Sequence, residues 1–232
     1  GVFRFLQNSG RAATCLCFLL FLIRPLPAKD WLTFRVDSRR SGVSREKLKV
    51  SHLKLAWTIR SQHPPQTAWG GPAKWDAFAG IRGLRDMRDY DRCFPVVVAG
   101  DAAYFGSSVD DTLQCFDVRT GKRNWIFFAE GPIRVSPTIS AGRVYFGADD
   151  GFAYCLDARQ GRLLWKFRPS ENQPLILNNG RFISKWPCRS GVTVIDKTAY
   201  MAFSLLPWQP SWICALDAKT GLATGPGDRK ST

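Results

Sequence analysis

The residues best suited to binding a charged ligand are the cations of the segment 177–191. Arg181, Lys185 and Arg189 recur every four residues around Trp186. Guanidinium groups bind carboxylates and phosphates through paired hydrogen bonds, and cations also bind the faces of aromatic rings. The segment therefore predicts a loop that binds an anionic or sugar-like ligand or a protein partner. A structured connecting loop whose charges face solvent is the simpler interpretation of the same residues.

Few other side chains are placed for chemistry. The sequence has two histidines, His52 and His63, and no C-x-x-C-H haem attachment motif. Asp149-Asp150-Gly151 resembles part of a calcium-binding loop, but a hairpin turn explains it better. We therefore expect neither a catalytic residue nor a metal site in this chain.

The first 28 residues predict export. Arg4 and Arg11 precede the apolar run 13–23, which is too short for a spanning helix of about twenty residues. Ala28 supplies a small residue for cleavage. The pattern predicts a signal peptide over 1–28, a periplasmic or secreted protein and no membrane span; a buried core helix is the alternative.

The formal net charge of +14 invites a nucleic-acid interpretation. Most of that excess lies before residue 96, and no zinc-finger or helix-turn-helix pattern occurs. A solvated basic surface explains the charge, so we expect no nucleic-acid partner.

An internal repeat determines the expected fold. Each copy has an Asp, a Gly four residues later and, in the first two copies, a Trp four residues after the Gly. The members are Asp117, Gly121, Trp125, Asp157, Gly161, Trp165, Asp217 and Gly221. Short apolar runs separated by turn-forming residues predict four antiparallel strands in each copy. Four strands about every 40 residues are typical of a β-propeller blade.

The repeat divides the chain after the signal peptide. Residues 29–232 are expected to form part of a propeller, with repeat copies at 96–128, 136–168 and 190–227 and an insertion at 61–95. The predicted fold class is all-β: an incomplete propeller of four-stranded antiparallel blades, about three to four of which are present.

The segments 115–125, 155–165 and 215–221 resemble the A-L-D-x-x-T-G-x-x-x-W motif of PQQ-type repeats. That motif is found in quinoprotein alcohol dehydrogenases and in BamB-type outer-membrane assembly proteins. Residues 30–42 resemble the N-terminal segment of secreted members, and LKLAWTIR, 53–60, resembles the strand that carries the first blade's Trp. The resemblance implies that the repeat residues pack blades together, in enzymes and non-enzymes alike.

Two functions are compatible with the resemblance. The favoured one is a non-enzymatic, extracytoplasmic scaffold that binds a protein or another ligand, as BamB-type proteins do. The alternative is a fragment of a PQQ-dependent, alcohol dehydrogenase-like quinoprotein, for which the resemblance implies PQQ, a calcium ion and a catalytic Asp. No adjacent pair of cysteines occurs, and Glu46, Glu130 and Glu171 form no ligand cluster. No cofactor is evident, so PQQ and calcium would require a site supplied by missing blades.

The third copy departs from the motif, because Gly225 stands where a Trp is expected. In this family an N-terminal strand, here within 53–60, usually completes the last blade. A chain with few blades would leave open sheet edges, which recruit other chains. We therefore expect a fragment that tends to associate.

Overall fold

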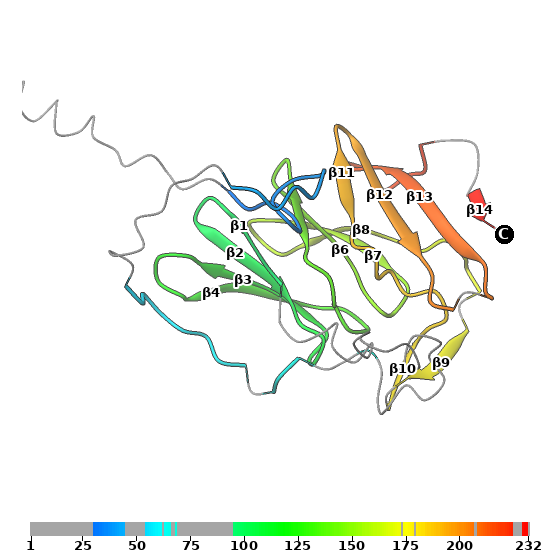
Figure 1. Ribbon diagram of the computed structural model, residues 1–232, viewed down its shortest axis with the longest axis horizontal. Coiled ribbons are helices and arrows are strands. Elements are labelled where there is room, and N and C mark those ends of the chain that lie inside the picture. The colour runs from blue at the N-terminus through cyan, green and yellow to red at the C-terminus, as the bar shows by residue number, and fades with distance from the viewer. Residues whose placement is uncertain are drawn as a thin grey trace, which may run out of the picture.

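The computed structural model describes residues 30–44, 54–61, 63–65, 68, 95–172, 174–178, 180–206, 208–224 and 229–231. These residues form strands and loops, with no helix among them (Figure 1). Accordingly, none of the described segments is a helix long and apolar enough to cross a membrane. The predicted signal peptide and most of the predicted insertion lie outside the described residues.

Three four-stranded antiparallel sheets make up most of the fold, and a two-stranded hairpin is added to them. The first sheet contains β1 (Val96–Ala99), β2 (Ala102–Gly106), β3 (Thr112–Asp117) and β4 (Arg123–Phe128). The second contains β5 (Thr138–Ser140), β6 (Arg143–Gly147), β7 (Ala153–Asp157) and β8 (Leu163–Phe167). The hairpin is β9 (Leu175–Asn178) with β10 (Arg181–Ser184). The third sheet contains β11 (Thr193–Ile195), β12 (Thr198–Phe203), β13 (Ser211–Asp217) and β14 (Arg229–Ser231).

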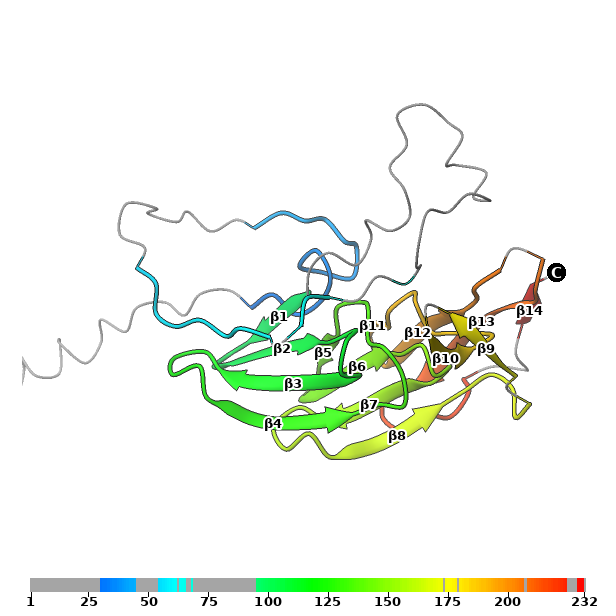
Figure 2. The same cartoon turned by 90° about the horizontal axis from the view of Figure 1, so that it is seen from below.

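Each sheet runs in chain order from its first to its fourth strand, and the first strands of neighbouring sheets lie side by side, β1 with β5 and β5 with β11. Figure 2 shows the sheets fanned in succession, as blades are around a propeller axis. Among the residues that the structure describes, the succession of sheets does not close into a ring. The predicted fold class, an incomplete propeller of four-stranded blades, is therefore confirmed.

Tight turns between strands follow from the local sequence. Ala141 and Gly142 join β5 to β6 with φ of 47° and 72°. Two positive φ values in a two-residue loop match the twist of the flanking strands, which is why such turns close hairpins. Asp149-Asp150-Gly151 likewise lies in the turn between β6 and β7, with Gly151 at φ 86°.

The core lies between the sheets. Along β6, Tyr145 packs into the cluster shared with the third sheet, whereas Val144 and Phe146 pack into the cluster shared with the first. Strand alternation thus gives one sheet two buried faces. Cys115 and Cys155 lie in these clusters as buried free thiols, and burial raises the pKa of Cys155 to about 12. They are small core residues, not reactive groups.

The segment 30–44 crosses the first strands of the blades (Figure 2). Trp31 pairs with Val98 of β1 through two backbone hydrogen bonds of 2.8 and 2.9 Å. The amide of Ile139 in β5 then donates to the carbonyl of Leu32 at 2.7 Å. The segment therefore fastens neighbouring blades along their inner strands.

Candidate functional site

The repeated Asp stabilises a turn at one end of each sheet. Asp117 Oδ1 accepts the backbone amides of Arg119 and Thr120 and the hydroxyl of Thr120 at 2.7–3.0 Å. Asp217 makes the same three bonds in the third sheet. Hydrogen bonds from these threonine side chains and backbone amides lower the pKa of both exposed carboxyls. These carboxylates are engaged in their own turns.

The repeated Trp and Gly join one sheet to the next. A Cβ built on Gly161 would lie 2.5 Å from Cδ2 of Trp125, so only glycine lets the indole of the first sheet lie on the turn of the second. Trp125 Nε1 also donates to the carbonyl of Ala158 at 3.1 Å. Between the second and third sheets Trp165 packs on Gly221 in the same way.

A tyrosine completes each junction. Tyr104 leans against Trp125 with ring centroids 5.9 Å apart and donates its hydroxyl to Ala158 at 3.2 Å. Tyr145 repeats this arrangement in the next sheet, donating to Ala218 at 3.1 Å. All the repeat residues that the sequence singled out are therefore used in turns and in packing between blades.

The loops at the opposite end of the sheets form the candidate functional surface, which we call the loop end: 107–111, 129–136, 148–151, and the described residues of 168–191 and 204–210. Backbone hydrogen bonds join these loops across blades. Asp149 N donates to the carbonyl of Pro132 at 2.9 Å, and Ser184 N donates to the carbonyl of Asp149 at 2.8 Å. The loop end is thus one connected structure fixed by main-chain bonds.

Two of the four predicted ligand-binding residues are held in ion pairs within the protein. Arg181 contacts Asp111 at 2.6 Å and also donates to two carbonyls of the loop between β2 and β3. Arg189 contacts Asp149 at 2.7 and 2.8 Å. Both guanidinium groups therefore bind carboxylates of loops from other parts of the fold and do not point into solvent as free charges.

Lys185 and Trp186 lie elsewhere in the same loop. The Lys185 ammonium lies 5.8 Å from the centroid of the Trp186 ring. Trp186 packs edge-on against Trp212 of β13 with centroids 6.5 Å apart. Trp186 therefore anchors the loop to the third sheet, and the four residues do not converge on one ligand.

Asp149 is the centre of the loop end. Its side chain is 1% exposed and is paired with two arginines, Arg134 at 2.6 Å and Arg189 at 2.7 Å. A carboxylate taken out of water must be compensated, and here two guanidinium groups supply that compensation. Sequence reasoning missed Arg134, because nothing in the spacing of these residues indicates that they meet.

Asp150 lies beside this centre but is compensated differently. It accepts the Tyr154 hydroxyl at 2.6 Å and the amides of Glu130 and Phe152 at 3.0 and 2.9 Å. No arginine is among these partners. Burial raises its pKa to about 6, although the three hydrogen bonds act in the other direction.

Three large, exposed apolar side chains of the loop end lie together on the β9–β10 hairpin. Leu175, Leu177 and Phe182 are 60–70% exposed. Because Phe182 pairs with Leu177 across the hairpin, and Leu175 lies two residues from Leu177, the three share one face. We call this face the hairpin patch; Figure 1 shows the hairpin projecting beyond the three sheets.

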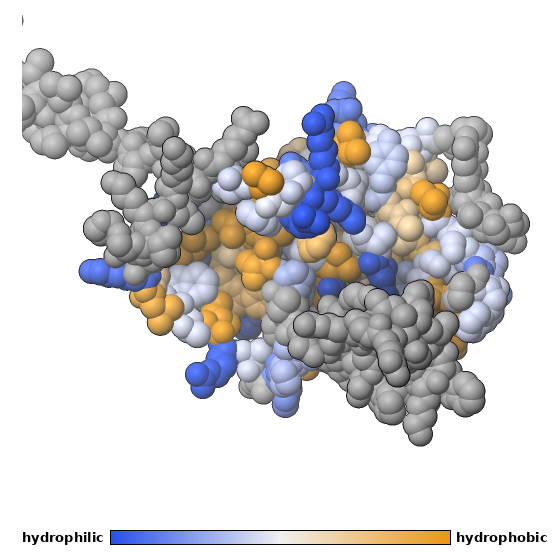
Figure 3. All heavy atoms as spheres, viewed as in Figure 1, coloured by the Kyte–Doolittle hydropathy of each residue, from blue (hydrophilic) through white to orange (hydrophobic). Residues whose placement is uncertain are grey.

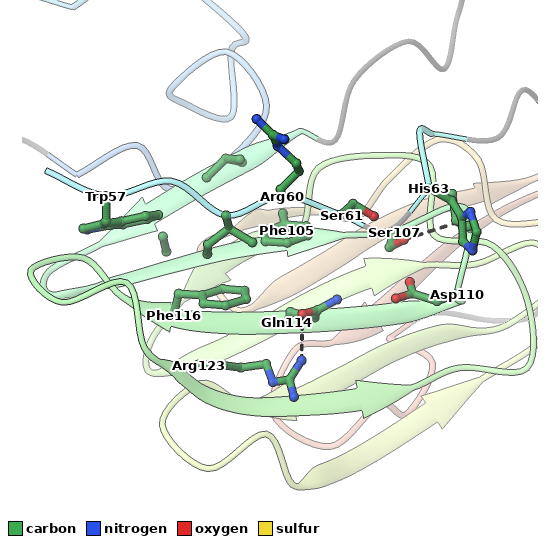
Figure 4. Close-up of a pocket in the computed structure, with 14 residues that line it drawn as sticks. Trp57, Arg60, Ser61, His63, Phe105, Ser107, Asp110, Gln114, Phe116 and Arg123 are labelled. Carbon is green, nitrogen blue, oxygen red and sulfur yellow. Dashed lines mark hydrogen bonds between the residues drawn. The ribbon is translucent and has the colours of Figure 1, made fainter. Parts of the chain in front are cut away.

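A cavity of about 660 Å³ lies on the face of the first sheet that points away from the second sheet (Figure 4). Trp57 and Ile59 border it on one side, and the stacked rings of Phe105 and Phe116 form its floor. Polar groups around it include His63, and Figure 4 shows them at its rim rather than converging on one point. The cavity is therefore mainly an uncovered sheet face.

The described residues do not fit a calcium–PQQ site. Among them, no three His, Cys, Asp or Glu side chains lie close enough to hold a metal ion. The most buried carboxylate, Asp149, is already paired with two arginines, which would repel a cation. We therefore derive no chemistry through such a cofactor in this part of the protein.

Successive four-stranded sheets joined by Trp, Tyr and Gly define an incomplete β-propeller of PQQ-type blades. A family model described as outer membrane protein assembly factor BamB matches residues 94–224. The match covers more than half of the chain, so the chain belongs to this family. No curated protein sequence matches it.

Solved structures with similar folds include two alcohol dehydrogenases. The chain matches a europium-containing methanol dehydrogenase with TM-score 0.58 and 15% identity, over 88% of this chain and 32% of that one. It matches the quinohemoprotein alcohol dehydrogenase from Comamonas testosteroni with TM-score 0.60 and 20% identity, over 92% of this chain and 29% of that one. At these identities the likeness shows the fold alone. The chain spans about a third of the length of these relatives.

Proposed function

We propose that this chain is part of a non-enzymatic propeller scaffold that works outside the cytoplasm and binds a protein partner through its loop end. The observation that carries the proposal is the hairpin patch. Three large apolar side chains, Leu175, Leu177 and Phe182, are held in the open by a hairpin whose own base is fastened to other blades. Apolar groups that gather on a rigid exposed element are typical of a protein-binding surface.

A protein partner explains the loop end better than an anionic or sugar-like ligand. The guanidinium groups of Arg181 and Arg189 already bind the carboxylates of Asp111 and Asp149, so these hydrogen-bond donors are engaged within the protein and are not directed at an anion. The repeat residues are likewise occupied in packing. Membership in a family described as an outer membrane protein assembly factor supports both the scaffold role and a location outside the cytoplasm.

Site-specific photo-crosslinking tests the proposal in the natural host. A photoreactive residue in place of Phe182 should yield one discrete adduct with another polypeptide. The matched control replaces Leu222, which is 69% exposed at the opposite end of the sheets. We expect no such adduct at 222. Equal labelling at both positions, or no adduct at 182, would overturn the proposal.

A further inference from the structure

The turns opposite the loop end carry an excess of positive charge. We call this surface the turn end; it comprises residues 100–101, 117–123, 141–143, 157–162, 196–197 and 217–222. These residues include eight lysines or arginines and five aspartates, a formal charge of +3, whereas the loop end has five cations and six carboxylates, a formal charge of −1. The two ends of the sheets therefore differ in the sign of their charge.

The two ends also differ in how their cations are used. At the loop end Arg134, Arg181 and Arg189 bind aspartates, and Arg168 binds Glu171. Five exposed cations of the turn end, within the part of the chain that the structure describes, form neither a salt bridge nor a side-chain hydrogen bond. These five are Lys122, Arg159, Arg162, Lys197 and Lys219. They are available to an anion outside the protein.

The repeat places a cation at the same position in each blade. Arg119, Arg159 and Lys219 each follow the turn Asp by two residues, and the backbone amide of each donates to that Asp at 3.0 Å. All three side chains are exposed, so cations recur along the arc once in every blade. Figure 3 shows hydrophilic side chains at the tip of the turn between β11 and β12, which contains Lys197.

The distribution of these cations favours an extended anionic surface over one small anion. The five unpaired cations lie in four turns of three blades. Because stacked sheets lie about 10 Å apart, cations of different blades cannot all bind the oxygens of one phosphate. A membrane leaflet with anionic lipids offers many phosphates that can move to each cation, and its negative potential attracts basic surfaces.

The other side chains of the turn end favour lipid over an acidic protein. Leu222 is 69% exposed beside Lys219, and Leu163, directly after Arg162, is 40% exposed. Aliphatic side chains next to cations suit the boundary between lipid headgroups and acyl chains. Surfaces that bind proteins depend mostly on aromatic residues and arginine, and the sequence of the turn end contains no aromatic residue.

We propose that the turn end is a peripheral binding surface for anionic phospholipid, with its cations on lipid phosphates and Leu222 at the acyl boundary. Because the loop end lies at the opposite end of the sheets, a protein bound in this way presents the hairpin patch away from the membrane. The proposal does not depend on what binds the hairpin patch.

Co-sedimentation of the purified protein with vesicles tests the lipid preference. Vesicles of phosphatidylcholine with phosphatidylglycerol should bind the protein, and vesicles of phosphatidylcholine alone should bind it much less. Added salt should weaken the binding, because it screens the attraction between exposed charges. Failure to prefer phosphatidylglycerol would overturn the proposal and would favour an acidic protein as the partner of the turn end.

Paired charge variants locate the binding surface. Arg159→Gln with Lys219→Gln removes two exposed cations of the turn end, and we expect it to raise the Kd for phosphatidylglycerol vesicles roughly thirtyfold. The control, Lys166→Gln with Arg168→Gln, removes the same charge near the loop end and should change the Kd little. Thermal unfolding checks that both variants keep the fold. Equal losses of binding would show that only net charge matters and would overturn the proposal.

A fluorescent reporter tests which end touches the membrane. An environment-sensitive fluorescent amino acid in place of Leu222 should shift its emission to the blue when phosphatidylglycerol vesicles are added. The same amino acid in place of Phe182 should not shift, because the hairpin patch faces away. A shift at 182 without one at 222 would place the hairpin patch on the membrane and would overturn the proposal.

Discussion

At the scale of single residues, aspartate has different roles at the two ends of the sheets: it stabilises exposed turns at one end and is buried between loops at the other. Asp117 and Asp217 are exposed carboxyls whose pKa values are lowered by hydrogen bonds within their turns. Asp149 and Asp150 are buried, one paired with two arginines and the other with a tyrosine and two amides. Turn geometry explains the first pair, and contacts between loops distant in sequence explain the second.

The glycine of the junction gives a sharp residue-scale prediction. Gly161→Ala and Gly142→Ala both place a side chain at positive φ, 69° and 72°. Only at Gly161 would the new Cβ also meet an indole, 2.5 Å from Trp125; at Gly142 it meets nothing within 4 Å. We expect Gly142→Ala to cost about 1 kcal/mol of unfolding free energy from backbone strain. Gly161→Ala should cost a further ~1–3 kcal/mol from overpacking. Urea denaturation of both variants measures the difference, and equal losses would contradict the role given to Trp125.

Asp150 predicts a pH dependence of stability. Its folded pKa of about 6 lies above 3.8, the ordinary pKa of an aspartate side chain, so the folded protein binds this proton more tightly than the unfolded chain. Protonation therefore favours folding; the contribution is fully present below pH 3.8 and is lost as pH rises through about 6. Relative to Asp150→Asn, the wild type should lose about 2 kcal/mol over this interval. Unfolding free energies of the two proteins across the interval provide the test, and parallel curves would show that Asp150 does not titrate in this way.

At the scale of elements, the loop end depends on Asp149 more than on any exposed ion pair. Asp149→Asn leaves two largely buried arginines without a full counter-charge, which should cost about 3–5 kcal/mol. The control is Asp101→Asn, which breaks a pair with Arg119 whose side chains are 67% and 75% exposed. That change should cost less than about 1 kcal/mol. Thermal and urea unfolding compare them, and similar losses would mean that the loop end is not built around Asp149.

The sequence predicted these elements better than it predicted their contacts. Strand alternation and turn residues are local, so four strands per copy followed from the printed sequence. The partners of Arg181 and Arg189 did not, because Asp111 and Asp149 lie 70 and 40 residues away and meet them only once blades stack. The candidate loop could therefore be located from the sequence, but the ion pairs that its arginines form with distant loops could not be inferred.

At the scale of the whole molecule, the contacts that stabilise the blades and the exposed hairpin patch lie at opposite ends of the sheets. Trp, Tyr and Gly join the blades at one end, while loops joined by buried ion pairs hold the hairpin patch at the other. A repeat of this kind is stabilised blade by blade through its neighbours. Any binding surface can then vary in the loops without disturbing the junctions.

Native mass spectrometry of the full-length protein, purified gently from its natural host, tests the central claim most directly. That claim is that the protein acts by holding a partner and not by redox chemistry. We expect a species whose mass equals that of the protein plus a second, different polypeptide, and this species should disappear when Phe182 is replaced by Glu. Stoichiometric PQQ and calcium on the protein, with alcohol oxidation in a dye-linked assay and no bound polypeptide, would contradict the account.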